Sequence, residues 1–262
     1  MKYQKELEAA IAAAKKAQTF ILEIYHTPFD IEIKADDSPV TAADKGADEM
    51  IRAHLAPLFP EDGFLTEESR DTKERLTKKR IWIVDPVDGT KEFVSRNGQF
   101  TTNIALAEDH QIVVGVINVP TMNLLYYAVK GEGAFRMNPD GSVERIHVSD
   151  RDDHLRTLRS ISFFNEKEKV FMAKHADRFE GEARPIGAAM KFCAIAEGSA
   201  DFFYRISAGT KEWDVAPGDL LVREAGGVMV DGNGKPFRYN REDVYNRDGY
   251  VLANKESNLV LD

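Results

Sequence analysis

Three β-rich runs follow one another in the middle of the chain, and they constrain its fold more than any other feature. They are FTTNIALAE (100–108), QIVVGVINV (111–119) and NLLYYAV (123–129). Only a few residues separate each run from the next, and strands joined by such short connections pair antiparallel. The region therefore predicts an antiparallel meander. Further strands are expected at 31–34, 64–67 and 80–85, and extensions of the sheet at GEGAF (131–135) and RIHVS (145–149).

Two amphipathic helices are predicted ahead of the meander. Residues 3–25 place apolar side chains at intervals of three and four, which is the spacing of one helical face. A second helix is expected over 43–55, because the residue before a proline avoids the helical conformation and Pro57 follows. The polar stretch ADDSP (35–39) between them is expected to be a turn.

After about residue 150 the pattern changes to alternating strands and helices. Strands are expected at 159–164, 183–187 and 200–206, and helices at 166–179, 188–198 and 213–227. This alternation predicts a layered α/β arrangement. We expect an N-terminal α+β half, residues 1–150, with the metal-binding motifs. A C-terminal α/β half, residues 151–262, is expected to hold the substrate-binding residues and the last metal-ligand aspartate.

The composition argues against several classes of function. A formal net charge of -9 over 262 residues is unlike the basic surface that general nucleic-acid binding needs. No apolar run reaches the length of a membrane span, and the first residues lack the apolar segment of a signal peptide. The single cysteine, Cys193, is expected to be a buried thiol in a reducing compartment. We expect a cytoplasmic protein that is a monomer or a homodimer.

The stretch IWIVDPVDGTKEF (81–93) places Asp85 and Asp88 at the end of an apolar strand. A strand-to-helix turn with Asp88 as a cap explains one aspartate. Two carboxylates so close together repel each other, and a cation between them lowers that cost. Thr90 adds a hydroxyl, and an all-oxygen ligand set suits a hard ion such as Mg²⁺.

Two further acidic sites support a metal centre. Glu67 and Glu68 end another apolar strand, and Asp214 stands just before a predicted helix, where a plain N-cap is the alternative. Carboxylates at the ends of three separate elements predict a site for two or three metal ions. The residue types and their spacing go no further than this. The six histidines show no metal-ligand spacing and are expected at the surface.

Four motifs together resemble the inositol monophosphatase-like superfamily of metal-dependent, lithium-sensitive phosphatases. They are VTAAD (40–44), LTEES (65–69), WIVDPVDGT (82–90) and WDVAPGDLLVREAGG (213–227). KADDSPVTAADK (34–45) and KEFVSRNGQFTTNIAL (91–106) resemble its 3′(2′),5′-bisphosphate nucleotidase branch. The resemblance implies a layered αβαβα sandwich of the inositol monophosphatase and fructose-1,6-bisphosphatase type. It also implies Mg²⁺-dependent hydrolysis of 3′-phosphoadenosine 5′-phosphate, a product of sulfate assimilation, to AMP and phosphate.

The resemblance further implies which residues hold the metal. One Mg²⁺ would be bound by four groups: Glu67, Asp85, the carbonyl of Val87 and Thr90. A second would be bound by three carboxylates: Asp85, Asp88 and Asp214. A weaker third ion would rest on Glu67.

Catalytic and substrate-binding roles follow from the same resemblance. Asp44 would bond to Thr90 and, with Glu67, help to orient or deprotonate the attacking water. The backbone amides of Gly89 and Thr90 would receive the phosphate. The remaining substrate contacts would come from Asp88, Lys191, Arg205 and Asp214.

Departures from the branch pattern keep other substrates open. Ala188 and Ala189 replace two serines, and Phe163 replaces a histidine after Ser162. Phe163 and Phe164 are read as core residues, with a stacking surface for a base as the alternative. Pro217 replaces a small residue and is taken as structural. The rival functions are an inositol monophosphate or sugar-phosphate phosphatase of the same superfamily, and a catalytically idle Mg²⁺/nucleotide sensor.

Overall fold

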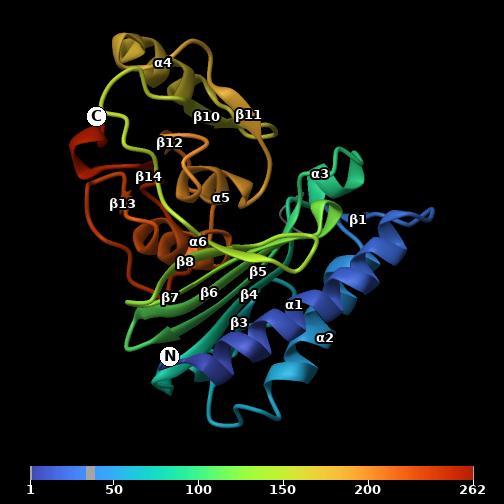
Figure 1. Ribbon diagram of the computed structural model, residues 1–262. Coiled ribbons are helices and arrows are strands. Elements are labelled where there is room, and N and C mark those ends of the chain that lie inside the picture. Colours follow the sequence, from blue (N-terminus) through green and yellow to red (C-terminus); the bar gives the residue numbers. More distant parts are fainter. Residues whose placement is uncertain (1, 34–38, 262) are drawn as a thin grey trace.

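Two β-sheets and three sets of helices alternate in five layers (Figure 1). The structure is a computed structural model that describes residues 2–33 and 39–261. This layered arrangement confirms the αβαβα fold class. From one outer face to the other, the layers are helices α1 (Gln4–Tyr25) and α2 (Ala42–Leu55), a seven-stranded sheet, helices α5 (Met190–Ala196) and α6 (Glu212–Glu224), a five-stranded sheet, and helix α4 (Glu166–Lys174).

The seven-stranded sheet contains the predicted meander. All neighbouring strands pair antiparallel except the first two, which are parallel. The meander and its extension are confirmed, because β5 to β9 pair in chain order. In order across the sheet, the strands are β3 (Gly63–Thr66), β4 (Arg80–Asp88), β5 (Thr101–Glu108), β6 (Gln111–Val119), β7 (Leu124–Val129), β8 (Gly133–Met137) and β9 (Val143–Ile146).

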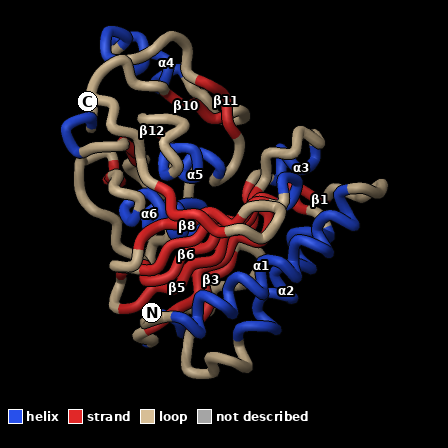
Figure 2. Tube along the Cα trace, in the orientation of Figure 1, coloured by secondary structure: helices blue, strands red, loops and turns tan. Residues whose placement is uncertain are grey.

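Helices α1 and α2 lie side by side on one face of this sheet (Figure 2). The buried face of α1 is rich in alanine, which lets the helix approach α2 and the sheet closely. The start of α2 is fixed by a capping box: Thr41 Oγ1 accepts the Ala43 N–H at 3.1 Å, and Asp44 Oδ2 accepts the Thr41 N–H at 2.8 Å. A separate pair of short strands, β1 (Glu32–Ile33) and β2 (Pro39–Val40), precedes α2.

The opposite face of the seven-stranded sheet is covered by α6. Gly115 of β6 makes this contact possible, because a Cβ there would lie 2.9 Å from the carbonyl oxygen of Pro217 and 3.0 Å from its Cα. Helix α5 packs against α6 in the same manner, with the ring of Phe192 directly over Gly218. Cys193 of α5 is buried, as its apolar surroundings predict.

The five-stranded sheet separates α5 and α6 from α4. Strand β10 pairs parallel with both β11 and β12. The remaining pairs, β12 with β14 and β14 with β13, are antiparallel. In order across the sheet, the strands are β11 (Arg184–Ile186), β10 (Thr157–Ser160), β12 (Phe202–Arg205), β14 (Tyr250–Ala253) and β13 (Val228–Asp231). The division of the chain near residue 150 stays a prediction.

Several predicted elements differ from the structure in their bounds. The strand expected at 159–164 ends at Ser160, because Ser160 Oγ accepts the Phe163 N–H at 3.2 Å and turns the chain. The helix expected to reach residue 179 ends at Lys174 and gives way to a short 3-10 turn. Most of the predicted turn at 35–39 lies outside the described residues. Strands β13 and β14 had not been predicted. Within the described residues, no helix combines the length and apolar character that crossing a bilayer requires.

We expect Gly115→Ala to destabilise the protein by about 1–3 kcal/mol, because the added methyl group has to push α6 away from the sheet. The measurement is the free energy of unfolding from urea titration. Gly209→Ala is the matched control, since a Cβ at Gly209 meets open space. Equal stability of the two variants would contradict the close packing of α6 on β6.

Candidate metal and substrate site

A bulge in β4 brings the side chains of Asp85 and Asp88 to the same side of the sheet. Residues three apart on a regular strand point to opposite faces. Here Asp85 pairs with Asn103 and Asp88 with Thr101, so three steps on β4 match two on β5. One extra residue in β4 therefore reverses the direction of Asp88. Asn103 Nδ2 and Thr101 Oγ1 both reach Asp88 Oδ2, at 3.1 and 3.4 Å.

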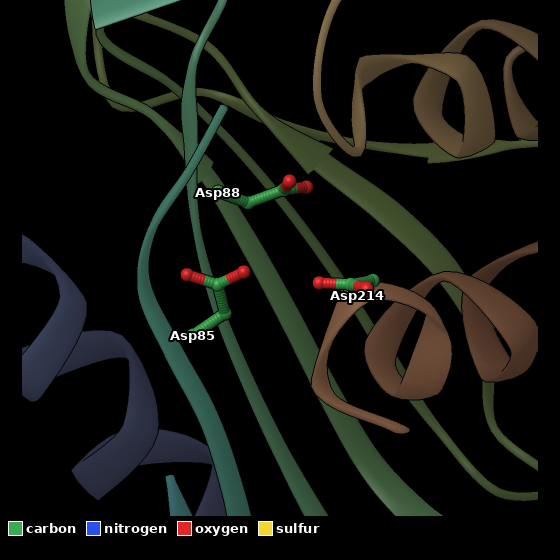
Figure 3. A group of neighbouring side chains, drawn as sticks. All are labelled: Asp85, Asp88 and Asp214. Carbon is green, nitrogen blue, oxygen red and sulfur yellow. The ribbon is translucent and has the colours of Figure 1, made fainter. Parts of the chain in front are cut away.

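Asp214 joins this pair from the middle helical layer (Figure 3). Oxygen atoms of Asp85, Asp88 and Asp214 all lie within 4.8 Å of one another. Asp214 is the third residue of α6 rather than its N-cap, and its Oδ2 accepts the N–H of Lys211 at 2.6 Å. The simple N-cap interpretation is therefore wrong, although the side chain does serve the start of the helix.

Thr90 connects the aspartate cluster to α2. It is the first residue of the short helix α3 (Thr90–Val94), which follows Gly89 in the left-handed conformation. Thr90 Oγ1 lies 3.0 Å from Asp44 Oδ1 and 3.3 Å from the carbonyl of Val87, and donates its proton to one of them. Asp44 is 1% exposed, and its other oxygen accepts both the N–H and the hydroxyl of Thr41. This chain of bonds holds the Asp44 carboxylate in one orientation.

Glu67 follows β3 at the same edge of the sheet. Its N–H donates to the carbonyl of Val84 at 3.1 Å, so the pairing of β3 with β4 continues to this residue. Glu67 and Glu68 both act electrostatically on Asp85, and Glu67 also acts on Asp88 and Asp214. The structure therefore brings all the predicted acidic residues of the metal centre to one place.

The pKa values of Asp85, Asp88 and Asp214 are raised. Burial is the largest cause for each of them, followed for Asp85 and Asp214 by the charges of neighbouring carboxylates. The pKa of Asp88 rises to about 6, against the opposing effects of Lys191 and Asn103. The pKa of Asp214 rises to about 7 through burial and the charges of Asp88 and Glu67. The pKa of Asp85 lies well above its ordinary value.

The cluster fits a divalent cation. Asp85 is 1% exposed, and its Oδ1 is buried and has no hydrogen-bond partner. A buried, unpaired carboxylate oxygen costs free energy, and a cation would supply the missing partner. Aspartate and glutamate oxygens, a threonine hydroxyl and a carbonyl are the ligand types that hard ions prefer.

A cavity of about 880 Å³ is lined by the acidic cluster and by basic and aromatic side chains. Lys191, in the first turn of α5, is 9% exposed and donates to the carbonyl of Ala188. Burial lowers the pKa of Lys191, and the negative charge of Asp88 acts in the opposite direction. Arg205, at the end of β12, is 7% exposed and donates to the carbonyl of Phe163. We call the part of the cavity at Asp85, Asp88 and Asp214 its acidic end and the part at Lys191 and Arg205 its basic end, although the charges of Asp88 and Asp214 also act on Lys191.

Phe163 lies at the surface of this cavity, which corrects its interpretation as a core residue. It is 49% exposed and lines the cavity. Lys91 Nζ lies 4.2 Å from the centre of its ring, and Arg205 Cζ lies 5.3 Å from it. Phe164 is half-buried, with the guanidinium of Arg159 over its ring.

Several residues of the site are not singled out from the sequence. Thr101 and Asn103 contact Asp88 and belong to a polar run at the start of β5, and this run ahead of apolar residues is an available signal. The others carry no local signal of function: Glu92, Ser162, Lys211, Trp213, Tyr245 and Tyr250.

Comparison with known proteins gives matches along nearly the whole chain. Residues 2–260 match the model of the inositol monophosphatase family. The chain is 36% identical over 250 residues to the 3′(2′),5′-bisphosphate nucleotidase CysQ of Escherichia coli K12, which covers 94% of this chain and 99% of that protein. The solved CysQ of Bacteroides thetaiotaomicron is similar with a TM-score of 0.85 at 36% identity, covering 97% of this chain and 99% of that one. An IMPase of Thermotoga maritima is similar with a TM-score of 0.79 at 26% identity, covering 95% and 92%.

We expect the stability of the metal-free protein to depend on pH through Asp214. An acid with a raised pKa in the folded state binds more protons folded than unfolded, so stability falls as pH rises from about 4 to about 7 and then levels off. Asp214→Asn should remove this contribution, so that in EDTA the variant gains stability over the wild type as pH rises through this window. Thermal unfolding with EDTA and with MgCl₂ measures both effects.

Magnesium should raise the unfolding temperature of the wild type more at about pH 8 than at about pH 5, because protons compete for the same oxygens. Magnesium should raise the unfolding temperature of Asp214→Asn much less. Asp153→Asn, at an exposed position, is the control for removing a charge. A difference between wild type and Asp214→Asn that does not change with pH would contradict this account.

Proposed function

This chain belongs to the inositol monophosphatase family, and on that premise we propose that it is a Mg²⁺-dependent 3′(2′),5′-bisphosphate nucleotidase. It is a phosphoric monoester hydrolase. Its substrate is 3′(2′)-phosphoadenosine 5′-phosphate, and its products are AMP and phosphate. The observation that carries the choice of substrate is the division of the cavity into an acidic and a basic end.

A substrate with two separate phosphates matches this division of charge. The scissile phosphate belongs at the acidic end, where bound cations reverse the sign of the site. The second phosphate belongs near Lys191 and Arg205, which are buried cations. Arg205 already has the carboxylate of Glu168 at 3.7 Å, and the charge of Asp88 acts on Lys191, so a second phosphate would add to these partners. A monophosphate such as inositol 1-phosphate would not supply this added attraction.

Magnesium at the acidic cluster supplies positive charge against the phosphate oxygens and lowers the pKa of water. Two or three ions would be held there: by Glu67, Asp85, the Val87 carbonyl, Asp88, Thr90 and Asp214. The chain's own groups orient the nucleophile. Thr90 Oγ1 accepts a hydrogen bond from the attacking water while it donates to Asp44 Oδ1, which lies 3.0 Å away. The water passes a proton to Thr90 Oγ1 as the Thr90 proton passes to Asp44, and Glu67 is a second acceptor. The water oxygen bonds to phosphorus, the bond from phosphorus to the 3′ (or 2′) sugar oxygen breaks, and that oxygen takes a proton from solvent.

The scissile phosphate is received by the backbone amides of Gly89 and Thr90. Asp88 and Asp214 contact the sugar beside it, because both carboxylates border the cavity. Catalysis of phosphoryl transfer is mainly positioning and electrostatics, so these contacts suffice without a covalent intermediate.

The base lies on Phe163 in this proposal. The ring is exposed at the cavity, and the cations of Lys91 and Arg205 hold it in place. Stacking on an aromatic ring is tolerant of base identity. Phe163 therefore takes over binding that the missing hydroxyls of Ala188 and Ala189 do not provide.

Two other functions remain as alternatives. The loss of hydroxyls at Ala188 and Ala189 favours an inositol or sugar-phosphate phosphatase, because it weakens the case for a nucleotide. A catalytically idle Mg²⁺/nucleotide sensor would not need the Asp44–Thr90 bond that orients water. We place the reaction in the cytoplasm, where the lone thiol of Cys193 stays reduced.

The first test is phosphate release with Mg²⁺ from four substrates: 3′-phosphoadenosine 5′-phosphate, inositol 1-phosphate, fructose 1,6-bisphosphate and AMP. We expect a preference for the first of them. Asp88→Asn should lower kcat/KM by about 1,000-fold or more, a loss of about 4 kcal/mol in transition-state stabilisation. Preference for inositol 1-phosphate would select the first alternative.

The fold of Asp88→Asn is checked by circular dichroism, with the exposed Asp153→Asn as the control variant. Near-normal hydrolysis by well-folded Asp88→Asn would contradict the proposed metal site. Binding of Mg²⁺ and nucleotide without release from any substrate would select the sensor.

Phe163→Ala should raise KM for 3′-phosphoadenosine 5′-phosphate by about tenfold with little change in kcat, because stacking contributes about 1–3 kcal/mol per base. Phe163→Tyr should retain the wild-type KM. Val170→Ala removes an apolar side chain that is 66% exposed on α4, and it is the matched control. An unchanged KM for Phe163→Ala would exclude Phe163 as the base-stacking residue.

A further inference from the structure

Glu92 is a buried acid in the wall of a cavity that has to admit an anionic substrate. It is the third residue of α3, is 3% exposed and lines the cavity beside Lys91. A negative charge here opposes the binding of a second phosphate nearby. Glu92 has no role in the proposed reaction, so a different physical effect must explain a buried carboxylate at this position.

The surroundings of Glu92 show that it joins three loops. Its Oε1 accepts the hydroxyl of Ser162 at 2.5 Å, across 70 positions of sequence. Its Cγ lies 3.0 Å from the place of a Cβ at Gly187, and its Oε2 lies 3.2 Å from the place of one at Gly89. The side chain is therefore enclosed by the loop before α3, the loop after β10 and the loop before α5.

The loop after β10 carries the outer wall of the cavity. Ser162 directly precedes Phe163, whose ring lines the cavity and whose carbonyl accepts a hydrogen bond from Arg205. Holding Ser162 therefore fixes an aromatic surface and one of the partners of the Arg205 guanidinium, which also has the carboxylate of Glu168 at 3.7 Å. The loop is anchored on its other side by the bond from the Phe163 N–H to Ser160 Oγ.

The neighbouring contacts between these loops are weaker or uncharged. Gly187 N–H donates to Gln99 Oε1 at 2.9 Å, and Ala189 N–H donates to Thr101 Oγ1 at 3.4 Å. Both hold the loop before α5, and neither reaches Ser162. A hydrogen bond to an ionised carboxylate is about twice as strong as one between neutral groups. Glu92 is thus a charged anchor of the loop after β10, in addition to the bond from Arg205 to the carbonyl of Phe163.

We propose that Glu92 is a positioning residue that, through Ser162, holds Phe163 and Arg205 in the arrangement that binds the non-reacting part of the substrate. This inference rests on the proposed nucleotidase function. Glu92 does not touch the reacting atoms. Its effect is on the selection of a nucleotide bisphosphate over a small phosphomonoester that occupies only the acidic end of the cavity.

The test compares kcat/KM for 3′-phosphoadenosine 5′-phosphate and for 2-glycerophosphate in Ser162→Ala, Glu92→Ala and the double variant. We expect the ratio of the two values to fall by about tenfold in Ser162→Ala, through KM for the bisphosphate, and by less in Glu92→Ala, because that variant also removes the charge that opposes the second phosphate. The double variant should show the same loss as Glu92→Ala, because the bond to Ser162 is already absent in that variant. Glu92→Gln should retain most of the ratio, since its amide oxygen can still accept from Ser162.

A measurement without turnover accompanies the kinetics. Calorimetric titration with AMP in MgCl₂ should show weaker binding by Ser162→Ala, by about the same factor as the rise in KM. Thr19→Ala, which removes an exposed hydroxyl bonded only to its own helix, is the matched control. Equal losses on both substrates would mean a general structural role and overturn the inference, as would an unchanged ratio and AMP affinity in folded Ser162→Ala.

The failure of the inference can be told apart from the failure of the proposed function. A wild-type enzyme without preference for the bisphosphate overturns the function, and the inference with it. A wild type with that preference whose variants keep the ratio overturns the inference alone.

Discussion

The carboxylates of Asp85, Asp88 and Asp214 have oxygen atoms within 4.8 Å of one another, and the rest of the structure has to withstand their repulsion. Burial removes the water that would screen such charges, which is why burial is the largest cause of all three raised pKa values. Without protons or cations the cluster destabilises the folded state. The hydrophobic layers on both sides of the seven-stranded sheet offset this cost.

Rigid elements rather than loops hold the cluster together. The bulge of β4 directs two of the carboxylates, and β5 receives one of them through Thr101 and Asn103. The third comes from α6. Pro217, three residues beyond Asp214 on this helix, contacts Gly115 of β6, and this contact sets the distance of the helix from the sheet. The same packing that stabilises the middle layer therefore also sets the separation of the acidic groups.

The sequence predicted the layers, the meander and the acidic motifs, because each of these has a local signature. It could not predict that Asp85 and Asp88 share a face, because a residue separation of three places them on opposite faces unless a bulge intervenes. Strands β13 and β14 are not predicted because a long irregular segment separates them, so no short connection indicates that they pair. Phe163 was read as a core residue because apolar type is a guide to burial only on average. Glu92 gave no signal, since a glutamate in the first turn of a helix is common.

The two ends of the cavity place opposite demands on a ligand, and this limits the substrates that suit the protein. At the acidic end, cations are needed before any phosphate can approach, so affinity there depends on the metal. At the basic end, Lys191 and Arg205 are already buried, with the carboxylate of Glu168 3.7 Å from Arg205, so the loss of their hydration has occurred during folding. An anion that reaches them gains attraction without a further loss of hydration on the protein side, which is the advantage of a preorganised site. A ligand that spans both ends therefore binds more favourably than the sum of a phosphate at the metal and a neutral group beyond it. Ala188 lines the cavity without a hydroxyl and Ala189 is fully buried, and neither alters that electrostatic advantage.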